Sequence, residues 1–113
     1  MALPPENLID IAASLRQATT DGPIWSLNSE QLNLNLLRLP SGDGIAPHVN
    51  SEVDVVLVIF EGHGELTVDN VVYPLRPGLA VVVPRGVTRA MRCMAGPLVY
   101  LTCHRRRAGL MPS

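Results

Sequence analysis

Beyond residue 23, short hydrophobic runs and turn residues follow one another at intervals of about eight to twelve residues, which is typical of an all-β sandwich or barrel. Within this pattern, residues 32–36 alternate strictly between Leu and Asn, which predicts a strand with one buried face and one wet face. Residues 55–60 are hydrophobic throughout, which predicts a strand covered on both faces. The predicted strands are Ile24–Leu27, Leu32–Leu39, Val53–Glu61, Glu65–Val68, Val71–Leu75, Leu79–Val83, Arg89–Cys93 and Leu98–His104.

One amphipathic helix is predicted ahead of these strands. Hydrophobic residues recur at helical spacing from Leu8 to Ala18, and the acidic Glu6 and Asp10 lie near its start, where the helix dipole favours them. Because the hydrophobic stripe of such a helix must be covered, we expect it to pack on the outside of a sheet. The chain therefore divides into a helical segment, residues 1–22, and one β-domain, residues 23–113.

Length and composition fit a single domain with a real core: the chain has 113 residues, of which 47% are hydrophobic and 17% charged. The net charge is −1, from nine basic and ten acidic residues, so we expect neither a nucleic-acid partner nor a membrane surface. The hydrophobic run at residues 55–60 is too short to cross a bilayer. No segment resembles a targeting signal, and we expect a cytoplasmic protein.

The two cysteines are expected to be free thiols. Cys93 and Cys103 flank a predicted hairpin that turns near residues 95–97. In such a hairpin the two residues would lie several positions apart along the ladder, too far for a disulfide. Free thiols agree with a reducing compartment.

The spacing of turn residues in the second half of the chain resembles a known family motif. The residues in question are Gly78, Pro84, Gly86, Arg89 and Cys93. Their spacing is similar to that of the second cupin motif, G-x5-P-x-G-x2-H-x3-N. The resemblance implies an all-β fold of the cupin type, a double-stranded β-helix or jelly-roll barrel, here with a short N-terminal α-helix.

An upstream segment resembles the first cupin motif, G-x5-H-x-H-x3,4-E-x6-G. The matching residues are Gly42, His48, Asn50, Val55 and Gly62. In metal-binding cupins this motif supplies two His and one Glu, and the second motif supplies a third His. Three intervening residues after Asn50 would place the Glu position at Asp54, whereas the six-residue gap to Gly62 places it at Val55. We prefer Val55, because a strand cannot change length without exchanging its faces.

Carried over position by position, the resemblance keeps one of four metal ligands. His48 is retained, while Asn50, Val55 and Arg89 stand at the other three positions. An amide is a poor ligand for a transition metal, and a guanidinium repels a cation. We therefore expect no metal and no other cofactor. The alternative is Fe, Mn, Ni or Zn held by unusual ligands; His48 with His104 or Asp54 would come first, and His63 is a further candidate.

Polar side chains at the motif positions suggest a small-molecule site. His48, Asn50 and Arg89 are expected at the mouth of the barrel, with Asp54 as a further candidate. The fork of a guanidinium suits a carboxylate or a phosphate, so the predicted function is binding of a small organic, anionic ligand. Two alternatives stay open. One is a metal-dependent enzyme of the dioxygenase, isomerase or decarboxylase type, and the other is a structural or regulatory barrel with a filled cavity.

Two further expectations concern the last strand and the assembly. Period-two counting places Tyr100, Thr102 and His104 on one face of that strand; either face could point inward, although the apolar residues between them fit a core better. The strands 24–27 and 32–39 resemble sheet edges that a second chain would cover. Because many cupins pair two barrels, the resemblance implies a two-fold homodimer.

Overall fold

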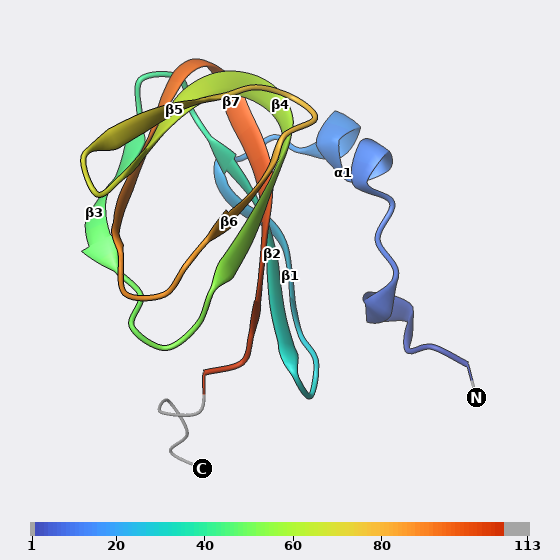
Figure 1. The fold of residues 1–113 in the computed structure, drawn as a ribbon. Helices are drawn as coiled ribbons and strands as arrows, with labels where there is room; N and C mark the ends of the chain where they lie inside the picture. Colours follow the sequence, from blue (N-terminus) through green and yellow to red (C-terminus); the bar gives the residue numbers. More distant parts are fainter. Residues whose placement is uncertain (1, 108–113) are drawn as a thin grey trace.

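The computed structural model describes residues 2–107. Within that range the chain forms, in order, η1 (Pro5–Asn7), α1 (Ile11–Gln17), β1 (Gly22–Asn28), β2 (Leu32–Leu39), β3 (Gly44–Val49), β4 (Val55–Val68), β5 (Val71–Leu75), β6 (Ala80–Val83) and β7 (Thr88–Arg105). All strand pairings are antiparallel, and the strands curl into a barrel (Figure 1). The all-β prediction is confirmed. The end of the predicted β-domain, residues 108–113, lies outside the described residues.

Two long strands, β4 and β7, pair with each other and connect both halves of the barrel. On one side the order is β1-β2-β7-β4-β6, built on the first part of β4 and the last part of β7. On the other side the order is β3-β7-β4-β5, built on the remaining parts of the same strands. This arrangement is of the jelly-roll type, as predicted.

The expected hairpin near residues 95–97 is wrong, because β7 runs through this region as one strand. β4 likewise runs through Gly62, which was predicted as a break. The register between the two strands shifts between Ile59 and Gly64, where they bend together. Gly62 has a φ of +83°, and a Cβ there would overlap the carbonyl oxygen of Pro97. The turn residues in both strands therefore mark one shared bend.

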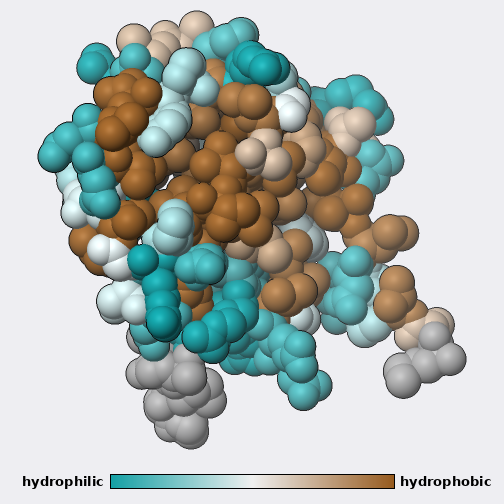
Figure 2. All heavy atoms as spheres, viewed as in Figure 1, coloured by the Kyte–Doolittle hydropathy of each residue, from teal (hydrophilic) through white to brown (hydrophobic). Residues whose placement is uncertain are grey.

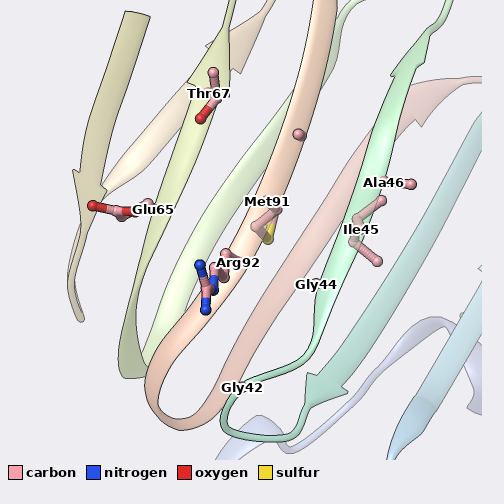
Figure 3. A pocket seen from close by; sticks show the side chains of 9 residues that line it. Gly42, Gly44, Ile45, Ala46, Glu65, Thr67, Met91 and Arg92 are labelled. Atoms are coloured by element: carbon pink, nitrogen blue, oxygen red, sulfur yellow. The ribbon is translucent and has the colours of Figure 1, made fainter. Parts of the chain in front are cut away.

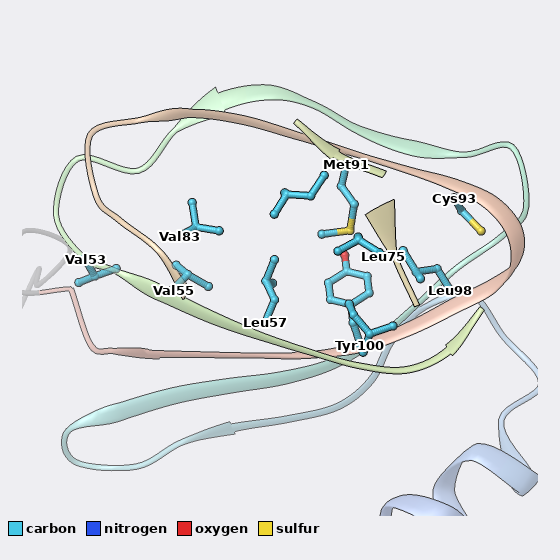
Figure 4. Close-up of a cluster of buried hydrophobic side chains, with 11 residues drawn as sticks. Val53, Val55, Leu57, Leu75, Val83, Met91, Cys93, Leu98 and Tyr100 are labelled. Carbon is cyan, nitrogen blue, oxygen red and sulfur yellow. The ribbon is translucent and has the colours of Figure 1, made fainter. Parts of the chain in front are cut away.

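The hydrophobic core lies inside the barrel, between the two halves (Figure 4). On β4 the buried positions alternate on each side of the bend, at residues 55, 57 and 59 before it and at 64 and 66 after it, and the register shifts between them change the parity. The buried cluster consists of Val53, Val55, Leu57, Ile59, Leu66, Leu75, Val83, Met91, Cys93, Leu98 and Tyr100. Most of these residues come from β4 and β7, so the two long strands supply the larger part of the core.

The helix is shorter than predicted. Asp10 caps α1 by accepting a hydrogen bond from the backbone N–H of Ala13 at 2.9 Å, which leaves Leu8 outside the helix and 79% exposed. No residue of α1 is buried. The expectation that its hydrophobic stripe packs on the outside of a sheet stays a prediction: Ile11 and Leu15 are half-buried, and Figure 1 shows the helix beside the barrel, with the N-terminal segment extending away.

Three strand predictions need correction. The outer face of β4 is covered only in part, since Val56 is 36% exposed while its inner neighbours Val55 and Leu57 are buried. β2 is not an edge strand, because it lies between β1 and β7. β3 was not predicted: its sequence carries Pro47 and no hydrophobic alternation, and all its residues are exposed.

The remaining sequence expectations concern thiols and the membrane. Cys93 and Cys103 are both free, as predicted, although they lie on one strand instead of on two strands of a hairpin. Among the residues described, no helix has the length and hydrophobicity needed to cross a membrane.

Candidate functional site

An apolar cavity with a volume of about 230 Å³ lies inside the barrel. Its wall is hydrophobic except for a few polar side chains contributed by β3 and β7. It is lined by Leu37, Ile45, His48, Val55, Leu57, Leu66, Arg89, Ala90, Met91, Tyr100 and Thr102. An apolar cavity with a few convergent polar groups is the usual form of a small-molecule site.

His48 and Arg89 are cross-strand partners in the β3–β7 ladder, so backbone pairing brings the two side chains together. Nε of Arg89 donates a hydrogen bond to Nε2 of His48 at 3.1 Å. Nδ1 of His48 lies 3.0 Å from the carbonyl oxygen of Ala46. These partners assign the tautomer: Nδ1 carries the proton and donates to Ala46, and Nε2 accepts from Arg89.

The guanidinium of Arg89 is half-buried at the cavity wall. Burial lowers its pKa below the ordinary value, the positive charge of Arg107 lowers it further, and Tyr100 acts in the opposite direction. No carboxylate among residues 2–107 forms an ion pair with Arg89; the ion pair in this part of the chain joins Arg38 and Asp21. The cavity therefore holds a positive charge that lacks a counter-ion from the described part of the chain.

Asn50 and Asp54 shape the loop that follows β3. The Asn50 side chain is 8% exposed, and its Oδ1 accepts from the backbone N–H groups of Glu52 at 3.2 Å and Val53 at 3.3 Å. Asp54 is exposed, and its Oδ1 accepts from the N–H of Arg85 at 2.8 Å. Neither residue is among those that line the cavity, so of the four predicted ligand-binding residues the structure brings only His48 and Arg89 to it.

The other two histidines also lie apart from the cavity lining. His63 is exposed at the bend, opposite Ala95. His104 is half-buried, with Nδ1 2.7 Å from the carbonyl oxygen of Arg105. Within residues 2–107 no group of three or more His, Cys, Asp or Glu side chains is placed to hold a metal ion.

Comparison with known proteins assigns the family. The family Cupin_2, described as a cupin domain, matches residues 35–104, which is more than half of the chain and includes β4 and β7 complete up to His104. The chain belongs to the cupin family. The match covers both segments in which the sequence resembles the cupin motifs.

Solved cupin-like structures share the fold of this cupin at low sequence identity. A cupin-2 domain-containing protein from Shewanella frigidimarina is 16% identical, with a TM-score of 0.70 over 88% of this chain and 95% of that one. BH2720 from Bacillus halodurans is 18% identical, with a TM-score of 0.76 over 87% and 79%. KdgF from Halomonas sp. is 17% identical, with a TM-score of 0.68 over 75% and 78%. No curated protein matches the chain.

The residues at the cupin metal positions of this chain do not fit a transition-metal ion. Val55 is buried at the cavity wall and offers no donor atom. The Oδ1 atom of Asn50 is used by two backbone N–H groups, and Nε2 of His48 already accepts from Arg89. The guanidinium of Arg89 adds a positive charge beside that nitrogen. A transition-metal site needs three or four donors, and this set does not supply them.

Tyr100 and Thr102 are cavity residues that the sequence reasoning did not select. The polar face of the last predicted strand points into the barrel, whereas the sequence favoured its apolar face for the core. Tyr100 is 4% exposed and burial raises its pKa, an effect that Arg89 partly offsets. Its side chain lines the cavity, where a ligand can reach the hydroxyl. The alternation of the strand already predicted that Tyr100 and Thr102 share a face, but it did not show that this face points into the barrel.

A larger hollow of about 500 Å³ lies along β3, β7 and β4 (Figure 3). Glu65 and Thr67 line it, and they flank the buried Leu66, so this hollow lies largely on the outer side of the sheet. It is open to solvent and contains neither His48 nor Arg89. The smaller interior cavity is therefore the better candidate site.

Proposed function

We propose that this cupin binds a small organic anion inside its barrel. The observation that carries the proposal is the half-buried guanidinium of Arg89 at the wall of an apolar cavity, with no carboxylate among the described residues to balance it. A buried charge without a partner is unfavourable, and a bound carboxylate or phosphate would remove that cost. The hydrogen bond to His48 fixes the guanidinium through Nε and leaves its two terminal amino groups for the anion.

The cavity also defines the rest of the ligand. A volume of about 230 Å³ corresponds to roughly eight water molecules, which favours a ligand smaller than a typical drug. Leu37, Leu57 and Leu66 would contact a hydrocarbon or aromatic body. The hydroxyls of Tyr100 and Thr102 could bind one polar substituent on that body. The ligand class is therefore a compact organic acid with an apolar body.

The donor set favours binding over metal-dependent catalysis. Since His48 is engaged by Arg89 and Val55 occupies the Glu position, we propose that the protein works without a resident transition metal. We also propose a cytoplasmic location, which the two free thiols support.

We further propose a homodimer formed through the outer face of the sheet β1-β2-β7-β4-β6. Residues directly opposite in a ladder share a face, and two successive rows across these strands are apolar. The rows are Leu27, Leu34, Cys103, Val56 and Val82, and Trp25, Leu36, Leu101, Val58 and Ala80.

This outer face is only partly covered, with Val82 61% exposed. Figure 2 likewise shows hydrophobic residues at the surface of the single chain. Leu3 and Leu8 of the N-terminal segment are exposed, and Figure 1 shows this segment extending away from the barrel. A second copy supplies both an apolar face of the same shape and a second N-terminal segment, so it can cover both features at once.

The test of ligand binding compares benzoate with the neutral benzamide by calorimetry and by thermal unfolding. Benzoate should bind and raise the melting temperature, benzamide should not, and Arg89→Gln should abolish the benzoate effect. Arg92→Gln is the matched control, because Arg92 lies on the same strand and lines the outer hollow. The proposal fails if benzoate stabilises wild type and Arg89→Gln equally, or if no member of a panel of small carboxylates and phosphates binds.

A further inference from the structure

The chain beyond β7 is held against the end of the barrel that contains the loop after β3. Nη2 of Arg105 donates to the carbonyl oxygen of Glu52 at 3.2 Å. The backbone N–H of Arg106 donates to Gln31 at 2.8 Å, and its Nη1 donates to Ser29 at 3.3 Å. Figure 1 shows this segment turning beneath the barrel as it leaves β7. The next residue, Arg107, is thereby placed at this end of the barrel.

Arg107 has a donor atom without an acceptor in the part of the chain that the structure describes. Its side chain is half-buried, and Nε is buried with no hydrogen-bond partner among residues 2–107. Leaving a buried donor without an acceptor is unfavourable, and more so for a charged group. The charge of Arg107 acts on Arg89, which places the two guanidiniums within electrostatic reach of each other. Two like charges held together at a partly buried site are unfavourable until an anion joins them.

We infer that Arg107 is a second guanidinium of the anion site, and that the site takes a doubly charged head group such as that of a phosphate monoester. This inference rests on the proposed function. Arg89 on β7 and Arg107 just beyond the same strand would contact the head group from two directions, while its organic body occupies the cavity. A phosphate monoester carries close to two negative charges above its second pKa of about 6 and can accept from both guanidiniums.

A third donor at this end of the barrel agrees with the inference. Nδ2 of Asn50 is buried and has no hydrogen-bond partner within the described range, residues 2–107, although Oδ1 of the same side chain has two. Asn50 lies two residues after His48 and two before Glu52, whose carbonyl binds Arg105. Unused donors on Asn50 and Arg107 and the positive charge of Arg89 favour an oxygen-rich anion over a cation or a neutral ligand.

The test uses phenyl phosphate and phenyl sulfate, which have the same skeleton but carry two charges and one charge at about pH 8. Calorimetry on the full chain should show phenyl phosphate binding at least about tenfold more tightly than phenyl sulfate. Arg107→Gln should remove most of this preference and weaken phenyl phosphate by about tenfold or more, while leaving phenyl sulfate less affected. Arg106→Gln is the matched control, because it removes the same charge from the neighbouring residue, whose side chain is bonded to Ser29.

The outcomes separate this inference from the proposed function. Suppose that wild type binds both ligands equally, that Arg107→Gln has no effect on affinity, and that Arg89→Gln loses affinity. This result overturns the role of Arg107 but leaves an anion site at Arg89. A loss of equal size in Arg106→Gln also overturns it, since the effect would then be one of net charge. Binding that is insensitive to Arg89→Gln overturns both. Circular dichroism of each variant shows whether it is folded.

Discussion

Nε of Arg89 and Nε2 of His48 are joined by a hydrogen bond of 3.1 Å between facing residues of β7 and β3. This bond occupies the imidazole nitrogen that would otherwise be free to bind a metal, and it holds the guanidinium in one orientation. The retained histidine of the cupin motif therefore positions a cationic group here. This relationship leads to the first two predictions.

Protein purified without chelators should contain well under one equivalent of Fe, Mn, Ni or Zn. The reason is the donor set: a valine, an engaged amide and an engaged imidazole stand beside a guanidinium. Elemental analysis by mass spectrometry measures the metal content. A near-stoichiometric metal that disappears in His48→Ala would contradict the prediction.

Replacing His48 with Ala should weaken binding of an anion by about tenfold, because Arg89 loses the acceptor that orients it. His48→Gln should restore much of the affinity, since its side-chain oxygen can accept from the guanidinium. His63→Ala is the control, because His63 is exposed at the bend. If His48→Gln and His48→Ala bind equally weakly, the hydrogen bond is not what positions Arg89.

The stability of the folded protein should fall at alkaline pH through Tyr100. Burial raises the pKa of its phenol above the ordinary value of about 10, so the folded state holds the proton more tightly than the unfolded state does. The resulting stability is fully present below about pH 10 and is lost as the pH rises through the folded-state pKa. Urea titrations across this range should show a steeper loss for wild type than for Tyr100→Phe. Tyr73→Phe, at an exposed tyrosine, should behave like wild type.

The shared bend of β4 and β7 should be sensitive to a single added methyl group. Gly62→Ala places a Cβ against the carbonyl oxygen of Pro97 and also demands a positive φ. Gly86→Ala demands a similar φ of +84° but has open space around it. We expect Gly86→Ala to cost roughly 1 kcal/mol and Gly62→Ala to cost clearly more, as measured by denaturant unfolding. Equal costs would show that the close approach to Pro97 is not important.

The dimer should depend on the apolar outer face of the sheet. Light scattering at micromolar concentration should give about twice the monomer mass of 12.2 kDa for wild type. Val56→Asp places a charge in the middle of the row that also contains Val82 and Cys103, and it should shift the mass to that of a monomer. Glu65→Gln, on the other side of the barrel, should have no effect. A monomeric wild type would refute the dimer.

The sequence predicted the strands well where hydrophobic alternation was strong. β2 and β5 have the predicted bounds, because each lies between clear turn residues. β3 was missed because an exposed edge strand does not require a hydrophobic face, and it is the strand that carries His48. The bend at Gly62 and Pro97 was interpreted as two turns, since glycine and proline mark a sharp bend within a strand as strongly as they mark its end.

Three aspects of the site depended on tertiary arrangement and could not be deduced from the motif. Spacing alone placed His48 and Arg89 at the cavity, but it did not show that their side chains bond to each other. Asn50 and Asp54 serve the loop through hydrogen bonds to backbone N–H groups. Arg107 belongs to no motif, and only the path of the chain after β7 brings it near Arg89.

The turn at Pro84–Gly86 is tied to the loop after β3 by two hydrogen bonds, from the N–H of Arg85 to Asp54 and from the N–H of Gly86 to the carbonyl of Asn50, both 2.8 Å long. Neither bond uses a side chain that lines the cavity. The residues that hold the loops at the barrel mouth are therefore different from the residues that line the cavity. Val55, Arg89 or Thr102 could therefore be replaced to fit a different ligand, while these two hydrogen bonds maintain the conformation of the barrel mouth.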